Sequence, residues 1–333
     1  MKTSIPMLRY VVGSSFIVAI TALMNYDLAY LTSVLALGYL SPGSKPLTLK
    51  QGFNFIIILI LITGLTVVFS ELFLDYALVF MPILALGLLW LYFTDKLPVM
   101  VKLFLLMSLI VIPFVSIDSG AIGTYVAVRL VFNALMAIVL TQIIFLVFPL
   151  SDADIAFEKA QQKVSIKSEK ERFSYAVQII IIMLPVLLLF YIFKLSSSVL
   201  ILIFIAILSM SPALANPKVG LALIAANILG GVVAILVFEL LVIVPNFTFM
   251  ILLTLCVGLL FGSRLFSKHK LAVIFGSGFS TFLLILGSVT ASDAEAGDKV
   301  WTRVIQITIA VIYVVVAFGI LDKIKKYKMQ QAI

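Results

Sequence analysis

A chain of 333 residues in which 63% are hydrophobic and only 11% are charged lacks the charged side chains that would cover a soluble protein of this length. The formal net charge of +8 does not indicate a nucleic-acid partner, because most Lys and Arg residues lie in short stretches between apolar segments. A lipid bilayer replaces water around such an exterior, so the composition predicts an all-α polytopic membrane protein and excludes a large soluble fold.

Twelve apolar segments, separated by charges and by Pro or Gly breaks, are candidate transmembrane helices, since a helical crossing needs roughly 20 apolar residues. In chain order they are Met7–Asn25, Leu28–Leu40, Phe53–Leu72, Tyr76–Phe93, Val99–Ser116, Ile122–Phe148, Phe173–Phe193, Ser197–Ser211, Val219–Val244, Phe247–Gly262, Leu271–Thr290 and Val300–Leu321. The second and eighth are short and could be tilted or half-inserted helices, so ten crossings stay open as an alternative.

The distribution of basic residues favours twelve crossings over ten. With a cytoplasmic N-terminus and twelve alternating helices, 19 of the 23 Lys and Arg residues fall on the cytoplasmic side. The exceptions are Arg129, Lys194, Lys299 and Arg303. This bias predicts that both termini lie in the cytoplasm.

The longest polar stretch, Ser151–Arg172, separates a first transmembrane half, residues 1–150, from a second half, residues 173–333. Ser151 followed by acidic residues is a helix N-cap signal, which predicts a short surface helix. About 22 residues are too few for a folded domain, so we interpret residues 151–172 as a cytoplasmic connector.

The two halves share sequence marks at a nearly constant spacing, which predicts an internal repeat. The paired marks are Arg9 with Arg172, Ser41-Pro42 with Ser211-Pro212, Glu71 with Glu239, and Arg129 with Arg303. Six helices per half make a parallel repeat, with a site expected between the halves. Five per half would make an inverted repeat, as in drug/metabolite transporters.

Four ionisable residues lie within apolar segments, where an unpaired charge is costly and therefore a functional candidate. Arg129 and Arg303 could hold a substrate carboxylate through the planar guanidinium fork, and Glu239 and Glu71 could carry a coupling proton. The structural alternative is a set of Glu–Arg pairs that only fix helix packing.

Asn133 and Asn227 lie on the same helices and are added to the substrate-binding candidates, with interhelical hydrogen bonding as the alternative. A stripe of small residues, Ala222, Ala226, Gly230 and Ala234, predicts close helix contact.

The sequence lacks the motifs typical of ATP hydrolysis and of cysteine- or histidine-based sites. The chain has no Walker A sequence, one cysteine, Cys256, and one histidine, His269. We therefore expect neither an enzyme nor a bound metal or cofactor.

The paired marks resemble those of the fusaric acid resistance and aromatic acid exporter family. The segments that carry the resemblance are SPALANPKVGLALIAANILGGVVAILVFE and VWTRVIQITIAVIYVVVAFG. Many members carry a sizeable soluble domain after each half, whereas this chain has only the connector and a short tail, so it resembles a shorter form.

The resemblance implies proton-coupled efflux of aromatic or other weak organic acids across a bacterial inner membrane. The implied partners are a small organic anion as substrate, a periplasmic adaptor protein and an outer-membrane channel. Homo-oligomerisation stays open. The alternatives are a drug/metabolite-type carrier and a non-transporting membrane assembly or anchoring subunit.

Overall fold

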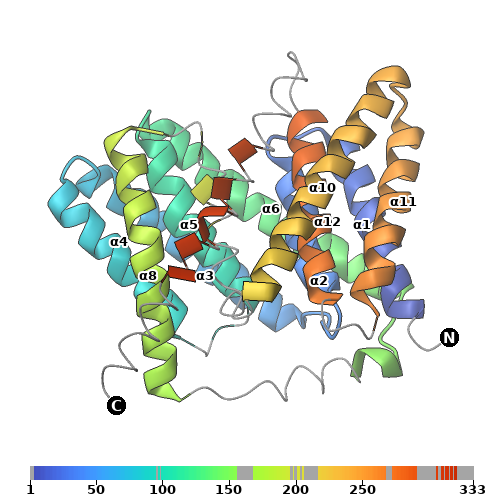
Figure 1. Ribbon diagram of the computed structural model, residues 1–333, viewed down its shortest axis with the longest axis horizontal. Helices are drawn as coiled ribbons and strands as arrows, with labels where there is room; N and C mark the ends of the chain where they lie inside the picture. Colours follow the sequence, from blue (N-terminus) through green and yellow to red (C-terminus); the bar gives the residue numbers. More distant parts are fainter. Residues whose placement is uncertain are drawn as a thin grey trace. The chain divides into compact units, whose positions relative to one another are not determined.

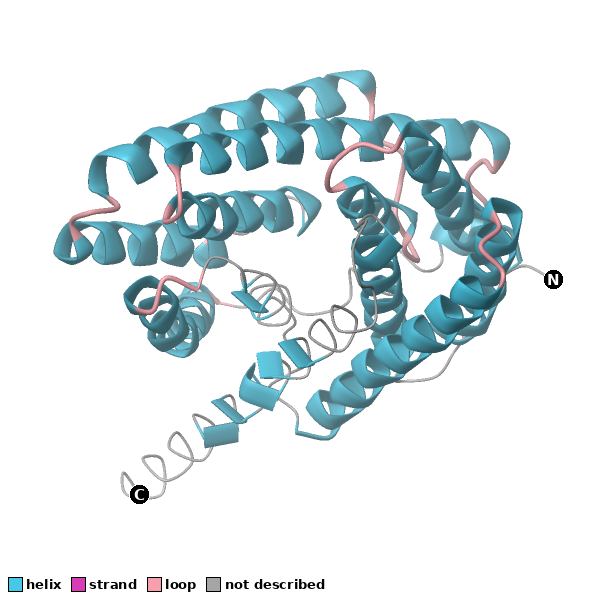
Figure 2. Ribbon diagram, turned by 90° about the horizontal axis from the view of Figure 1, so that it is seen from above, coloured by secondary structure: helices cyan, strands magenta, loops and turns pink. Residues whose placement is uncertain are grey.

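A computed structural model describes residues 4–94, 97, 99–155, 168–195, 198, 201–202, 205, 217–267 and 272–290, together with separate positions between 305 and 320. Across these residues the fold is helical and contains no strand (Figure 2). The helices are α1 (Ser4–Met24), α2 (Ala29–Leu40), α3 (Leu49–Phe73), α4 (Ala77–Phe93), α5 (Val99–Ser116), α6 (Gly120–Val147), α8 (Glu169–Ile192), α10 (Pro217–Ile243), α11 (Phe247–Leu265) and α12 (Ala272–Thr290).

Each of these helices coincides with one of the predicted apolar segments. Six of them, α1, α3, α6, α8, α10 and α11, contain stretches long and apolar enough to cross a membrane, and α2, α4, α5 and α12 contain shorter apolar stretches. Large hydrophobic side chains cover their outer faces, for example Leu78, which is 93% exposed. The structure therefore supports a membrane protein. The eighth and twelfth predicted segments, Ser197–Ser211 and Val300–Leu321, fall largely outside the described residues.

The connector begins as predicted. Residues 152–155 are helical, and the Ser151 backbone N–H donates to Asp154 Oδ2 at 2.9 Å, as at the start of a capped helix. Residues 156–167 lie outside the described part of the chain. The next helix, α8, begins at Glu169 because Ser168 and Glu171 form a capping box, so its first turn lies inside the predicted connector.

The helices form two compact units that are not the two halves of the sequence. Unit 1 contains Met1–Asn54, Phe132–Ser165 and Ala222–Ile305, and unit 2 contains Phe55–Val131, Ile166–Leu221 and Gln306–Ile333. Each unit is therefore assembled from segments of both halves. Three of the boundaries between the units fall inside the long helices α3, α6 and α10.

Within each unit, helices pack both against their neighbours in the sequence and against helices that are distant in the sequence. In unit 1, α1 packs against α2 and α11, and α12 packs against α2 and α11. In unit 2, α4 packs against α8 and α5, and Figure 1 shows α4 beside α8. Phe80 of α4 stacks on Tyr191 of α8, with ring centroids 5.8 Å apart.

A second contact in unit 1 brings two helix backbones together. A Cβ atom added to Gly278 of α12 would lie 2.6 Å from the backbone oxygen of Ala226 on α10, and one added to Gly230 would overlap the Gly278 carbonyl group. Ala226 and Gly230 belong to the predicted small-residue stripe, so the expected close contact is confirmed for these two positions.

We predict that Gly230→Ala lowers the thermal stability of the purified protein, whereas Gly64→Ala does not. Gly64 lies inside α3 with no atom within 4 Å of an added Cβ, so alanine there should gain about 1 kcal/mol in helix propensity. At Gly230 the added methyl group forces α10 and α12 apart, at a cost of about 1–3 kcal/mol. The midpoint of thermal unfolding in detergent measures both effects. Equal midpoints for the two variants would contradict the close contact.

Candidate functional site

Arg129, a predicted substrate-binding residue, lies on α6 within unit 2 and is half-buried. Its guanidinium carbon lies 5.1 Å from the ring centre of Tyr125, one turn earlier on the same helix. This cation–π contact orients the side chain along the helix surface. The predicted partner arginine of the second half, Arg303, lies outside the described residues.

Glu71 and Glu239 are both exposed, and neither makes an ion pair with any residue that the structure describes. The Glu71 side chain of α3, in unit 2, lies beside Gly120, the first residue of α6. A Cβ atom added to Gly120 would be 3.7 Å from Glu71 Oε1. The unpaired backbone N–H groups at a helix N-terminus favour a carboxylate there. Arg129 lies nine residues further along α6, about 14 Å in rise, so the predicted pairing of Glu71 with this arginine is not formed.

Asn133 is buried in unit 1 and bonded to a neighbouring helix. The Thr32 hydroxyl of α2 donates to Asn133 Oδ1 of α6 at 2.7 Å, and the Tyr26 hydroxyl lies 2.6 Å from Thr32 Oγ1. Thr32 and Asn133 are both 0% exposed. We call Tyr26, Thr32 and Asn133 the Asn133 cluster. It joins the turn before α2, α2 itself and α6.

Asn227 forms a second buried cluster in unit 1. Its Oδ1 accepts a hydrogen bond from Ser277 Oγ at 3.1 Å and another from Thr281 Oγ1, so the Asn227 cluster ties α10 to α12. Asn133 and Asn227 therefore both make the interhelical hydrogen bonds that the sequence left open as an alternative. Any contact of either amide with substrate is a further role that belongs to the proposed function.

We predict that Thr32→Val destabilises the protein by about 1–3 kcal/mol, because the nearly isosteric change removes a buried hydroxyl that donates to Asn133 Oδ1. Thr63→Val is the matched control: Thr63 is also buried, but its hydroxyl bonds only to backbone oxygens of its own helix. We expect the control to change stability by about 0.5 kcal/mol or less. Thermal unfolding of both variants tests this, and equal losses would show that the interhelical bond contributes nothing.

A buried ion pair that the sequence did not predict joins Arg9 of α1 to Asp154 at the start of the connector. Arg9 is 0% exposed and Asp154 is 3% exposed. Arg9 Nη1 also donates to the Pro149 carbonyl oxygen at 3.3 Å, and its guanidinium carbon lies 4.4 Å from the ring centre of Phe145. The Ser151 hydroxyl donates to the same carboxylate at 2.9 Å. This arrangement fixes the end of α6 and the start of the connector against α1.

No local signal in the sequence pairs these two residues, because they are 145 positions apart. Arg9 served only as a mark of the repeat, and Asp154 only as one of the acids after Ser151. The signal that could have found them is the burial of an arginine in the second turn of an apolar helix, since such a charge requires a partner.

We predict that Asp154→Ala destabilises the protein by about 3–5 kcal/mol, because Arg9 would remain buried without its counter-charge. The double variant Arg9→Met/Asp154→Ala removes both charges and should lose less than the single variant. Glu169→Ala is the surface control, since its carboxylate is 83% exposed and lies 3.8 Å from Arg172; we expect a loss of about 1 kcal/mol or less. A double variant less stable than Asp154→Ala would contradict this assignment.

None of the predicted site residues that the structure describes lines the cavity of about 230 Å³ that lies among α1, α2, α11 and α12 in unit 1. The cavity is therefore a candidate site that the charged residues of the sequence do not indicate.

No family model, no curated protein and no solved structure matches this chain.

Proposed function

We propose that this protein is a secondary transporter of the bacterial inner membrane that exports aromatic or other weak organic acids in exchange for protons. The observation that carries the proposal is Glu239 of α10, an exposed carboxylate on a membrane-length helix that makes no ion pair with any described residue. The surroundings of the Glu239 and Arg129 side chains support the role that we propose for each.

Glu239 lies on a helix face where apolar side chains reach the surface. Leu236 is 59% exposed, Leu240 is 43% exposed and Ile243 is 75% exposed. A carboxylate on a face that meets hydrocarbon costs several kcal/mol unless it is paired or hydrated, so such a residue is a functional candidate. We therefore assign the coupling proton to Glu239.

Arg129 supplies the complementary charge for an anionic substrate. It is half-buried on α6, a helix of 28 residues with membrane-spanning hydropathy, and its neighbour Val128 is 63% exposed. A guanidinium group presents two parallel N–H donors that match a carboxylate, and it stays charged at every physiological pH. We assign Arg129 to substrate binding, with Arg303 as its equivalent in the second half and with Asn133 and Asn227 as polar neighbours of the pathway.

We further propose twelve membrane helices in two parallel six-helix repeats with cytoplasmic termini. Matched helices support this: α1 with α8, α3 with α10, α4 with α11, and α5 with α12 have similar lengths and follow one another in the same order. Their contacts match too, because α1 packs against α11 in unit 1 as α8 packs against α4 in unit 2. In this proposal each unit combines the first helix of one repeat with the fourth and fifth helices of the other.

Transport of radiolabelled 4-hydroxybenzoate into proteoliposomes with an imposed pH gradient tests the function. We predict that Glu239→Gln abolishes accumulation driven by the gradient but keeps exchange of labelled for unlabelled substrate, because only the proton step is lost. Arg129→Ala should weaken substrate affinity roughly 10- to 100-fold, the effect of losing a charge-assisted hydrogen bond, and Arg129→Lys should restore part of it.

The matched controls are Glu169→Gln and Arg264→Ala, which change exposed charges at helix ends. Both should transport at the rate of the unchanged protein. Wild-type rates in Glu239→Gln and Arg129→Ala would remove these residues from the mechanism. If the unchanged protein transported no organic acid, an assembly or anchoring role would take the place of the proposed function.

A further inference from the structure

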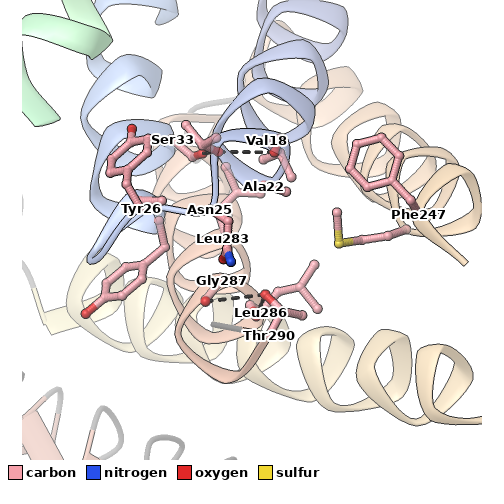
Figure 3. Close-up of a pocket in the computed structure, with 14 residues that line it drawn as sticks. Val18, Ala22, Asn25, Tyr26, Ser33, Phe247, Leu283, Leu286, Gly287 and Thr290 are labelled. Carbon is pink, nitrogen blue, oxygen red and sulfur yellow. Dashed lines mark hydrogen bonds between the residues drawn. The ribbon is translucent and has the colours of Figure 1, made fainter. Parts of the chain in front are cut away.

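The cavity in unit 1 lies where four helix ends meet: the end of α1, the start of α2, the start of α11 and the end of α12. Figure 3 shows Asn25 and Tyr26 from the α1–α2 turn on one side and Phe247 of α11 on the other. Leu283, Leu286 and Thr290 of α12 complete the wall.

The described part of the lining is uncharged but not uniformly apolar. Of the fourteen described residues that line the cavity, none is ionised at neutral pH, and Thr21, Asn25, Ser33 and Thr290 add amide and hydroxyl groups to it. Burial raises the pKa of the Tyr26 phenol, and a hydrogen bond with Thr32 only partly opposes this, so Tyr26 also stays neutral. The described lining offers an entering ion no counter-charge for the water that it loses, which favours a neutral occupant.

The aromatic side chains of the cavity favour a ring-shaped occupant. Tyr26, Tyr30 and Phe247 present rings, and Met250 contributes a polarisable thioether. The Asn25 side chain makes no hydrogen bond with any described residue, so its amide is available to a polar substituent on that ring. A cavity of about 230 Å³ suits a single substituted ring, since cavities near 150 Å³ already hold benzene.

The cavity is held in shape by the α1–α2 turn. Asn25 and Leu28 both have positive φ angles, 41° and 60°, which are unfavourable for residues other than glycine. The Tyr26 ring is fixed by its hydroxyl contact with Thr32 and by an edge-to-face contact with Phe132, with centroids 5.1 Å apart. Such a preformed wall reduces the entropy cost of binding a ligand.

We infer that this cavity is a binding site for a small neutral molecule with one aromatic ring and one polar substituent, such as a phenol. Its described lining contains none of the described charged residues assigned to transport, Arg129, Glu71 and Glu239. The inference therefore stands or falls without the proposed function, and an equilibrium binding experiment can test it.

The experiment titrates the purified full-length protein in detergent with 4-fluorophenol and follows binding by fluorine NMR. Phenols titrate near pH 10 and aromatic acids near pH 4, so at pH 7 4-fluorophenol is neutral whereas 4-fluorobenzoate, a ring of similar size, is ionised. We expect saturable binding of 4-fluorophenol and at least tenfold weaker binding of 4-fluorobenzoate.

Ala22→Leu places a larger side chain in the cavity without displacing buried atoms, because Ala22 is exposed there. It should weaken 4-fluorophenol binding at least tenfold. Ala19→Leu, on the same helix but outside the lining, should leave binding unchanged. Asn25→Gly keeps the left-handed backbone and removes the amide, so it should weaken binding of 4-fluorophenol more than that of fluorobenzene.

A second pair of variants guards against a folding defect. Phe247→Ala removes a ring from the wall, whereas Phe249→Ala, two residues away on α11, removes a ring that is not part of it. Selective loss of binding in Phe247→Ala supports the site. Equal binding by the unchanged protein, Ala22→Leu and Phe247→Ala would overturn the inference, as would equal affinity for the neutral and the ionised ring or the absence of saturable binding.

Discussion

The constraint on which this structure depends is that polar groups between apolar helices have no water to bond with, so each must find a partner within the chain. Most buried Ser and Thr hydroxyls meet it locally, as Thr63 and Ser70 do by donating to backbone oxygens of their own helix. Such bonds neither choose a neighbouring helix nor fix its position. The groups that cannot be satisfied locally, the amides of Asn133 and Asn227 and the guanidinium of Arg9, are therefore the ones that specify how the helices of unit 1 assemble.

The helices of unit 1 are held together both by these hydrogen bonds and by close contacts at small residues. Thr32 with Asn133 joins helices of the first half, and Thr281 with Asn227 joins helices of the second half. The contact between α1 and α11, which come from different halves, is made instead by small residues, since a Cβ atom added to Gly258 would lie 3.1 Å from Val11. In unit 1 the hydrogen bonds thus join helices within a half, whereas glycine contacts occur both within the second half, at Gly230 and Gly278, and between the halves, at Gly258.

The helices could be predicted from the sequence because each apolar run ends at charges or at Pro and Gly; α5 matches its predicted bounds, Val99–Ser116. The predicted starts of α3 and α8 lie too far along the chain, because the first turns of these helices are polar and hydropathy excludes them. The Ser168–Glu171 capping box nevertheless indicates where α8 begins. The sequence does not predict that each compact unit combines helices of both halves, nor that Arg9 pairs with Asp154. Both depend on contacts between residues far apart in the chain.

Under the two proposals, the cavity, whose described lining is uncharged, and the charged residues assigned to transport would favour opposite forms of the same kind of molecule. A carboxylic acid that titrates near pH 4 is almost entirely ionised at pH 7, and in that form it suits the guanidinium of Arg129. Its protonated form, or a phenol, suits a cavity lined by Tyr26, Phe247 and the amide of Asn25, where an ion would be desolvated without compensation. Under the proposed function, a weak acid would meet the two sites in different protonation states. Under that proposal, pH would set both the form in which the substrate is present and the driving force for the proton exchange assigned to Glu239.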